Sequence, residues 1–251
     1  MDITGNTVFI PGATSGIGLA LAIRLQERGN TVVIGGRRTE LLAQLETEHG
    51  FDTVRIDMAD RESIREASAT VLAAHPELNV VVAMAGIMRS EDWHSPAGFL
   101  ADAEEVVTTN LLGPIRLIAE FVDHLRTRPA ATIMTVSSGL AFVPLAITPS
   151  YDATKAGIHN LSEAIRVQLE DTSVRVVELV PPAVATDLLP GTDSHGMPLD
   201  AFADEVISLI ESQPDAQEIL VEAVHPLRFA EANGAYPATL ARLNGFGAPT
   251  A

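Results

Sequence analysis

The sequence predicts an α/β fold in which helices cover both faces of one doubly wound parallel sheet of about seven strands. Three observations support this prediction. Short apolar runs alternate with longer segments of helical character. One of these runs, residues 79–84, is apolar at nearly every position, as is typical of a parallel strand buried on both faces. A glycine-rich turn directly follows the first apolar run, in the order strand, tight turn, helix that begins such a sheet.

Length and composition limit the architecture and the partners. A chain of 251 residues with 47% hydrophobic residues can bury one large core, so we expect a single domain over residues 1–251. The absence of cysteine excludes disulfides and thiolate metal sites. The formal net charge of −17 repels nucleic acid and anionic lipid. We therefore expect no nucleic-acid partner, and an anionic ligand would need a local basic pocket.

Two further observations concern location. The first residues lack the basic and then apolar pattern of a secretory signal. No uninterrupted apolar run approaches the roughly 18 residues that suggest a membrane span. We expect a cytoplasmic protein that has no membrane partner.

The first strand is predicted at residues 6–11, and the turn and helix that follow it have the pattern of a phosphate cradle. Backbone N–H groups of such a turn, together with the helix N-terminus, suit a pyrophosphate. A glycine-rich turn alone is weak evidence, because many such turns bind nothing. The candidate contact residues are Gly12, Thr14, Ser15, Gly16, Ile17 and Gly18.

The second predicted strand, residues 31–36, is followed by Arg37 and Arg38. An acidic residue at this position would favour the free ribose 2′-hydroxyl of NAD, whereas arginine accommodates the 2′-phosphate of NADP. The pair therefore indicates NADP(H), with a solvated helix start as the alternative. The third strand, residues 51–57, leads to Asp57 and Met58, which we expect beside an adenine ring; Asp57 is equally well explained as a helix cap.

The middle of the chain supplies further elements. A helix is predicted over 61–74, and the strand at 79–84 ends in Ala85 and Gly86. A long helix over 104–126, bent at Gly113-Pro114, carries Asn110, although an asparagine within a helix is more often a surface or packing residue. The remaining predicted elements are a strand at 131–136, a helix from Tyr151 to about 171, a strand at 174–180, a helix at 199–212 and a strand at 218–221. The tail from Phe229 receives no assignment.

Tyr151 and Lys155 stand four residues apart, which places them on one helix face about 5–6 Å apart at Cβ. An ammonium beside a phenol favours the phenolate, and one charge at ~4 Å is worth up to ~3 pKa units at an effective dielectric of ~20. We expect a Tyr151 whose pKa is lowered toward neutrality, as suits a general acid/base. Ser138 lies thirteen residues upstream, directly after a predicted strand.

Taken together, these residues resemble the classical short-chain dehydrogenase/reductase family over about residues 5–221. The family's motifs occur here in order and at matching spacing, as Gly12-x-x-x-Gly16-x-Gly18, Ala85-Gly86, Asn110, Ser138, Tyr151-x-x-x-Lys155 and Pro181-x-x-Val184-x-Thr186. Segments 137–142 and 181–187 also resemble a bacterial subgroup labelled after an oxidoreductase of lipoteichoic-acid D-alanylation gene clusters. The resemblance implies a Rossmann-type fold.

The resemblance also implies hydride transfer between a carbonyl or alcohol carbon and the nicotinamide of NADP(H). Tyr151 would be the general acid/base, and Lys155 would lower its pKa and bind the nicotinamide ribose. Ser138 would hold the substrate oxygen, and Asn110 would keep a relay water near Lys155.

Further roles follow from the same resemblance. Arg37, assisted by Arg38, would contact the 2′-phosphate. Thr186 would reach the carboxamide, in a segment where Pro181 and Val184 also contact the cofactor. The stretch at about 183–200 would be the substrate loop.

Three positions depart from the family pattern. Pro11 replaces the usual threonine, Met84 replaces the second asparagine of Asn-Asn-Ala-Gly, and Pro182 stands where glycine is common. The family's threonine and asparagine tie adjacent strand ends together. Because both polar partners are missing here, we expect an apolar contact between Pro11 and Met84 that avoids a buried unpaired amide.

The function predicted from the sequence is an NADP(H)-dependent oxidoreductase acting on a small to medium apolar carbonyl or alcohol. Two alternatives use the same scaffold: a non-catalytic NADP(H)-binding sensor, and a lyase or epimerase with tightly held nicotinamide. Family members usually pair through the helices of Asn110 and Tyr151, which suggests a homodimer or homotetramer. We expect no metal, since the histidines at 94 and 195 have no convergent ligands. An apolar substrate pocket is suggested by Met88, Trp93, Phe142, Val143, Leu188 and Leu189, although packing at the exposed edge of the core explains any one of them equally well.

Overall fold

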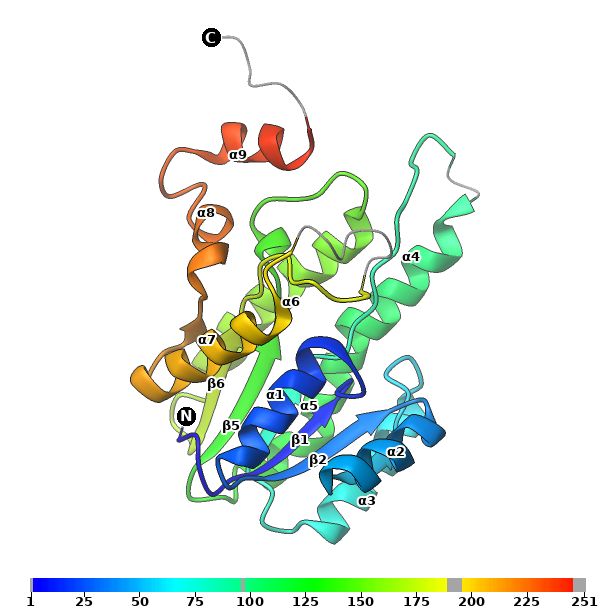
Figure 1. Ribbon diagram of the computed structural model, residues 1–251, viewed down its shortest axis with the longest axis vertical. Helices are drawn as coiled ribbons and strands as arrows, with labels where there is room; N and C mark the ends of the chain where they lie inside the picture. The colour runs from blue at the N-terminus through cyan, green and yellow to red at the C-terminus, as the bar shows by residue number, and fades with distance from the viewer. Residues whose placement is uncertain (1, 96–97, 189–195, 246–251) are drawn as a thin grey trace.

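The computed structural model describes residues 2–95, 98–188 and 196–245. Its centre is a seven-stranded sheet with the order β3-β2-β1-β4-β5-β6-β7, and every paired strand is parallel to its neighbour (Figure 1). The predicted doubly wound sheet is therefore confirmed. The strands are β1 (Thr7–Pro11), β2 (Thr31–Gly36), β3 (Asp52–Arg55), β4 (Val80–Ala83), β5 (Ala131–Val136), β6 (Val174–Leu179) and β7 (Glu218–Ile219).

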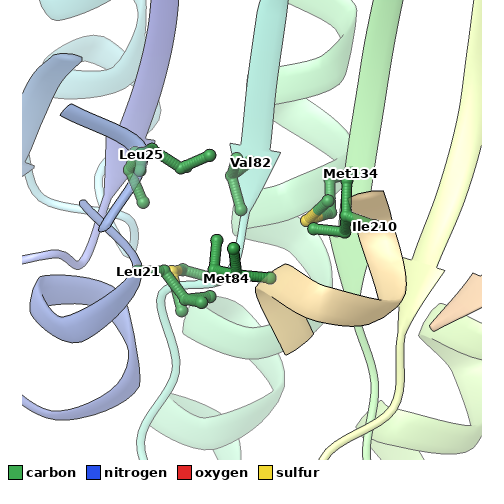
Figure 2. A pocket seen from close by; sticks show the side chains of 8 residues that line it. Leu21, Leu25, Val82, Met84, Met134 and Ile210 are labelled. Carbon is green, nitrogen blue, oxygen red and sulfur yellow. The ribbon is translucent and has the colours of Figure 1, made fainter. Parts of the chain in front are cut away.

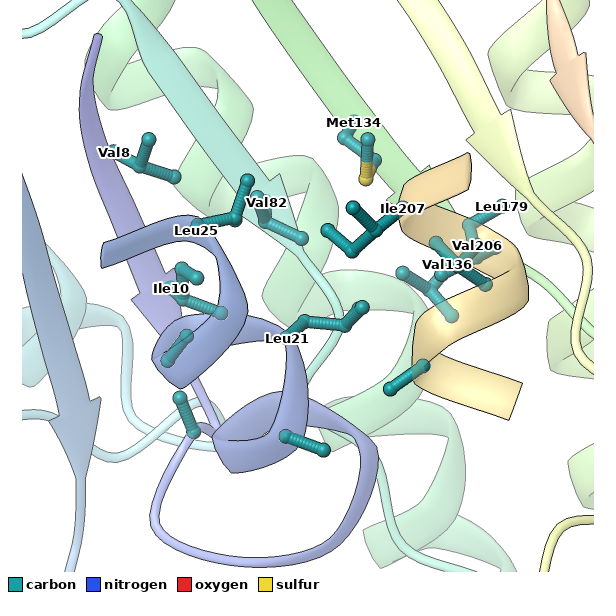
Figure 3. Close-up of a cluster of buried hydrophobic side chains, with 14 of the residues drawn as sticks. Val8, Ile10, Leu21, Leu25, Val82, Met134, Val136, Leu179, Val206 and Ile207 are labelled. Atoms are coloured by element: carbon teal, nitrogen blue, oxygen red, sulfur yellow. The ribbon is translucent and has the colours of Figure 1, made fainter. Parts of the chain in front are cut away.

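Helices cover both faces of the sheet, and each layer encloses its own apolar core. One core lies beneath α1 (Gly16–Glu27), α2 (Thr39–His49) and α7 (Leu199–Ser212), and Figure 3 shows part of it between α1, α7 and the sheet. The other lies beneath α3 (Arg61–Ala74) and α5 (Gly113–Leu125). The long helix α6 (Pro149–Gln168) packs on β5 and β6. This arrangement fixes the carboxyl ends of the strands at one edge.

The predicted bend in the long middle helix is a change of helix type. α4 (Leu100–Val107) continues into a π-helical segment, η2 (Thr108–Leu112), before α5 begins at Gly113. Segments of π-helix inside α-helices are rare and frequently occur at functional sites. Asn110 lies in the middle of this segment, which a regular heptad or 3.6-residue pattern does not reveal.

Several boundaries differ from the sequence-based expectation at element ends. The third and last strands are shorter than expected, because β3 pairs with β2 over four residues and β7 pairs with β6 over two. α6 ends at Gln168, three residues before the expected end, because residues 169–173 form the turn into β6. No helix among the described residues has the length and apolar character that a membrane crossing requires.

β7 is followed by α8 (His225–Arg228) and then by α9 (Tyr236–Leu243), which lies in the tail from Phe229 that received no assignment from the sequence. Two short 3₁₀ segments, η3 (Gly139–Ala141) and η5 (Glu222–Val224), lie in loops near it. Arg228 forms a paired contact with Glu218 of β7, with N–O distances of 2.8 and 2.9 Å. Figure 1 shows α8 and α9 leading away from the sheet beyond β7. α8 is thus attached to the edge of the sheet just before the tail begins.

Candidate active site

The glycine turn begins at the point where the strand order reverses, between β1 and β4. Open α/β sheets bind ligands at such a switch point. Gly12 has a φ of +88°, and a Cβ there would lie 2.8 Å from the Cα of Ala85, which follows β4. A Cβ on Gly18 would lie 2.7 Å from the Gly12 carbonyl oxygen. Both positions therefore require glycine. The backbone of the turn contacts the backbone of the Ala85-Gly86 segment directly.

The first turn of α1 is open to an anion. Ser15 is the N-cap residue, but its side chain makes no capping hydrogen bond, so it pairs none of the first helical N–H groups. Gly16 has a φ of +57°, and a Cβ there would lie 3.5 Å from the Thr186 methyl carbon. The segment after β6 thus lies across the glycine turn. A pyrophosphate fits this cradle, because free N–H groups and the helix dipole both favour negative charge.

Two arginines follow β2 at the same edge. Arg38 donates a hydrogen bond from its guanidinium to the Thr14 hydroxyl, at 3.0 Å. Arg37 is exposed and makes no hydrogen bond or ion pair with the part of the chain that the structure describes. Thr14 itself lies close to the strand end, since a Cβ on Gly36 would lie 2.5 Å from its methyl carbon. The expected basic pocket therefore adjoins the glycine turn.

Asp57 and Met58 form the corner after β3. The Asp57 carboxylate accepts a hydrogen bond from Ala59 N–H at 3.0 Å, whereas Asp60 caps α3 by accepting from Glu62 N–H at 2.9 Å. The alternative of Asp57 as the helix cap is therefore wrong. Met58 is buried against Gly113, at the start of α5. A contact of this corner with adenine stays a prediction.

Ser138, Tyr151 and Lys155 come together at the carboxyl edge of β5. Ser138 and Tyr151 are joined by a side-chain hydrogen bond. The Lys155 ammonium donates to the carbonyl oxygen of Val136, at 2.8 Å, and lies 5.5 Å from the centroid of the Tyr151 ring. All three side chains are buried. The spacing in sequence thus places a phenol, a hydroxyl and an ammonium in one buried group.

The electrostatics of this group differ from expectation. Burial raises the pKa of the Tyr151 phenol, and the hydrogen bond from Ser138 only partly opposes this. Lys155 does not lower the pKa of Tyr151 in this arrangement, which corrects the expected shift. Its own pKa is lowered to about 8 by burial, with Glu178 acting in the opposite direction. The physical reason is that removing both groups from water disfavours both charged forms.

Asn110 is fixed by the backbone of the loop after β4. Its side-chain oxygen accepts from Ile87 N–H at 2.9 Å, and its amide donates to the Ile87 carbonyl at 2.8 Å. A Cβ on Gly86 would lie 3.3 Å from the Asn110 oxygen, so this glycine permits the close approach. Asn110 therefore ties the π-helical segment to the strand end beside the glycine turn. Its role with a relay water stays a prediction.

The segment after β6 is held at both ends. The Pro181 carbonyl accepts from Gly139 N–H at 2.8 Å, next to Ser138. Val184 and Met197 form a parallel bridge, which closes the base of the expected substrate loop. Leu189, together with the rest of 189–195, lies outside the described residues. Pro181, Val184 and Thr186 thus lie on a segment that runs from Ser138 to the glycine turn.

Met84 shows how the chain accommodates one departure from the family pattern. Its side chain packs against the core under α1 and α7 and lines an apolar cavity of about 10 Å³ with Leu21, Val82 and Met134 (Figure 2). Pro11 pairs in register with Gly35 of β2. The apolar environment expected for Met84 is therefore present, while its contact with Pro11 stays a prediction.

The structure identifies three site residues that the sequence did not indicate. Glu91 is buried and accepts from the N–H of Ser150, which precedes Tyr151, at 3.0 Å. Asp152 accepts from Leu145 N–H at 2.8 Å and from the Thr148 hydroxyl at 3.2 Å. Asn244, after α9, accepts from Ala146 N–H at 2.6 Å and donates to the Pro144 carbonyl at 3.1 Å. Of the three, only Asp152 has a feature that the sequence could reveal, because its carboxylate directly follows Tyr151.

One group of potential metal ligands exists among the described residues, namely His159, Glu178 and Glu218. Glu218 is paired with Arg228, and the hydrogen bond that His159 donates to Glu178 raises the pKa of His159. His159 and Arg228 already pair with the two carboxylates. The group is therefore better explained as an ion-pair network, and the charge of its Glu178 also acts on Lys155.

The fold and this site define a Rossmann-type oxidoreductase, and comparison with known proteins gives the family. The model of the short chain dehydrogenase family matches residues 6–195. The chain belongs to the short-chain dehydrogenase/reductase family.

Among its relatives is an uncharacterized oxidoreductase, DltE of Bacillus subtilis, which is 40% identical over 92% of this chain and 93% of the relative. This match confirms the resemblance to the lipoteichoic-acid-cluster subgroup. An NADPH-dependent pterin aldehyde reductase of Arabidopsis thaliana is 28% identical over 83% of this chain and 88% of that protein. An alcohol dehydrogenase of Thermococcus sibiricus, solved with 5-hydroxy-NADP, is 26% identical with a TM-score of 0.75, covering 86% of this chain and 95% of that one.

Proposed function

We propose that this oxidoreductase is NADP(H)-dependent and transfers hydride between the nicotinamide and a small to medium apolar carbonyl or alcohol. The observation that carries the proposal is the burial of Ser138, Tyr151 and Lys155 in one group, with the Lys155 ammonium 5.5 Å from the centroid of the Tyr151 ring. The NADPH dependence of the pterin aldehyde reductase and the nucleotide in the alcohol dehydrogenase structure support this class of cofactor. The non-catalytic sensor is not proposed, because every expected catalytic side-chain type is present.

The proposed roles follow from the contacts of each side chain. The glycine turn, Thr186 and Lys155 would hold NADPH, and its nicotinamide would supply the hydride. Ser138 would donate a hydrogen bond to the substrate carbonyl oxygen and keep it beside the Tyr151 hydroxyl. Tyr151 would give its proton to that oxygen, and burial of the phenol excludes bulk water from the transfer.

The raised pKa of Tyr151 is consistent with a role as proton donor in carbonyl reduction. A phenol that keeps its proton at neutral pH is available as an acid, whereas alcohol oxidation needs the phenolate as a base. Lys155, whose pKa is lowered to about 8, carries its charge at neutral pH, and this ammonium would hold the nicotinamide ribose. Reduction is therefore expected to slow as Lys155 loses its proton in alkaline buffer.

Replacing Tyr151 by Phe tests the proposed activity. The substitution removes the proton donor and keeps the ring, so carbonyl reduction should fall by roughly 10²–10⁴-fold. Consumption of NADPH over a panel of carbonyl compounds is the measurement, with NADPH affinity measured separately. Tyr236→Phe is the matched control, because the chain contains two tyrosines and the second lies in α9. Turnover that survives Tyr151→Phe would refute the assignment.

The preference for NADP over NAD rests on Arg37 and Arg38. Arg37→Ala should weaken NADPH binding by about tenfold or more, because a charge-assisted bond to phosphate is lost, and should leave NADH binding nearly unchanged. Arg38→Ala should have a smaller effect on NADPH, because this side chain is already bonded to Thr14. Arg126→Ala removes the same charge from an exposed position after α5 and serves as the control. Equal weakening of both nucleotides by Arg37→Ala would contradict the assignment.

We also propose a homodimer or homotetramer paired through the α4–α5 and α6 helices. Apolar side chains are exposed on these elements at Leu100, Val107, Leu112, Ile115 and Val167. Exposed apolar side chains on these helices would be covered by a second copy of the chain. Light scattering at several protein concentrations tests the proposal, and a monomer at every concentration would exclude it.

A further inference from the structure

Trp93 is exposed and yet fixed in place. It is the single tryptophan of the chain, and 63% of it is accessible to solvent. Its indole N–H donates to a Glu91 carboxylate oxygen at 2.9 Å, and its ring packs on Phe99 with centroids 5.0 Å apart. A large aromatic ring that is already held loses little entropy when a ligand covers it.

Glu91 connects this ring to the helix that carries the proposed catalytic tyrosine. Its other carboxylate oxygen accepts from Ser150 N–H at 3.0 Å, and Ser150 directly precedes Tyr151 in the first turn of α6. Its own N–H donates to the Ile147 carbonyl at 2.9 Å. Glu91 is only 8% exposed. The Glu91 carboxylate therefore holds the indole and the start of α6, while the Glu91 backbone N–H holds the loop before α6.

The segment between β4 and Trp93 also passes the phenol itself. Met88 is buried in one cluster with Tyr151 and Val106. From Met88 to Trp93 the chain thus runs from the side of the phenol to an exposed aromatic surface. A ligand whose oxygen lies at Ser138 and Tyr151 would extend along this segment.

We propose that Trp93 is a specificity-determining residue of the substrate site, that Glu91 is its positioning residue, and that the substrate carries a flat, uncharged ring that stacks on the indole. This inference rests on the proposed function. Offset stacking suits a planar ring better than an aliphatic chain. The Glu91 carboxylate contacts the indole N–H, so an anionic substrate group is disfavoured there.

Intrinsic fluorescence gives a direct test, because all tryptophan emission comes from Trp93. In the presence of NADP⁺, which allows no reduction, 2-naphthaldehyde should change the emission saturably, whereas propanal should not. Free N-acetyltryptophanamide controls for collisional quenching, which rises linearly with aldehyde and does not saturate.

Variant kinetics give the second test. Trp93→Ala should raise KM for 2-naphthaldehyde by roughly tenfold while KM for propanal stays within about twofold, and Trp93→Phe should restore part of the loss. Glu91→Gln keeps one acceptor oxygen and should lose one of the two hydrogen bonds. It should shift the Trp93 emission to longer wavelength and raise KM for the naphthaldehyde more than it lowers kcat.

Two results would overturn the inference. One is an emission that responds to neither aldehyde, and the other is a Trp93→Ala variant in which both KM values change equally. Failure of the proposed function has a different signature, in which no carbonyl consumes NADPH. The fluorescence titration still decides in that case whether flat rings bind at Trp93.

Discussion

The glycine turn (residues 12–18) and the substrate-side wall (defined here as Glu91, the 144–148 loop and Asn244) lie near the same group of catalytic-type side chains but are built differently. In the glycine turn, backbone approaches backbone so closely that a single Cβ at Gly12 would meet the Ala85 Cα at 2.8 Å. In the substrate-side wall, side chains bridge segments that are distant in sequence, such as Glu91 and Ser150, 59 residues apart.

This difference separates the two proposed tasks of the site, cofactor binding at the glycine turn and substrate recognition at the wall. Where two backbones touch, an added side chain cannot be accommodated by a small shift. The geometry that suits a nucleotide is therefore either kept or lost as a whole. A contact through a side-chain carboxylate or amide can be weakened, shifted or replaced one hydrogen bond at a time. Substitutions in the glycine turn should therefore affect cofactor binding steeply, and substitutions in the wall should change substrate preference in small steps.

The largest expected effect is that of Gly12→Ala, which tests the steric side of the comparison. The added Cβ would overlap the backbone of Ala85, so NADPH binding should be lost or weakened by more than about 100-fold, with a lower melting temperature. Gly29→Ala is the matched control. Gly29 has a similar φ of +79°, but a Cβ there meets nothing within 4 Å.

Gly29→Ala should cost only the backbone strain of a left-handed alanine, about 1–2 kcal/mol, and leave NADPH affinity unchanged. Calorimetric titration and thermal unfolding of both variants distinguish strain from overlap. Equal loss of NADPH affinity in the two variants would show that the close approach to Ala85 is unimportant.

The same contrast explains which features could be predicted from the sequence. The glycines, the parallel strands and the Tyr151–Lys155 spacing are local patterns, and each follows from backbone geometry over a few residues. The raised pKa of Tyr151 and the fixed position of Trp93 depend instead on burial and on partners brought close by the fold. Asn244 is the extreme case, since its partners lie about 100 residues away and no local pattern marks it.

A smaller effect is expected for Asn244→Ala, which removes the contacts of Asn244 with the 144–148 loop of the wall. The variant loses the hydrogen bonds to Ala146 and Pro144, so the 144–148 loop becomes less fixed. KM for the substrate should rise a few-fold, on the order of one hydrogen bond's free energy, while NADPH affinity stays unchanged. Steady-state kinetics and nucleotide titration measure the two effects. Asn233→Ala, in the loop between α8 and α9, is the control, and an equal KM change there would contradict the assignment.

The smallest effect on activity is expected at Asp152, whose carboxyl group anchors the wall to the Tyr151 helix and acts on stability. Burial raises its pKa to about 7, against 3.8 in the unfolded chain; hydrogen bonds from Leu145 and Thr148 oppose the shift, and the charge of Glu91 adds to it. Below about pH 4 the group is protonated in both states and costs no stability. As the pH rises from about 4 to 7, the unfolded chain ionises first, and folding stability falls; above pH 7 the loss is constant.

Asp152→Asn should remove this pH dependence. An Asn oxygen can still accept from Leu145 N–H, and its amide can donate to the Thr148 hydroxyl, as a protonated Asp does. The melting temperature of the variant relative to the natural protein should therefore rise between pH 4 and 7 and level off above it. Asp123→Asn, which removes an exposed carboxylate, should give a flat difference. A flat difference for Asp152→Asn as well would mean that the buried carboxyl group is ionised throughout this range, and that the wall is anchored to α6 by a charge.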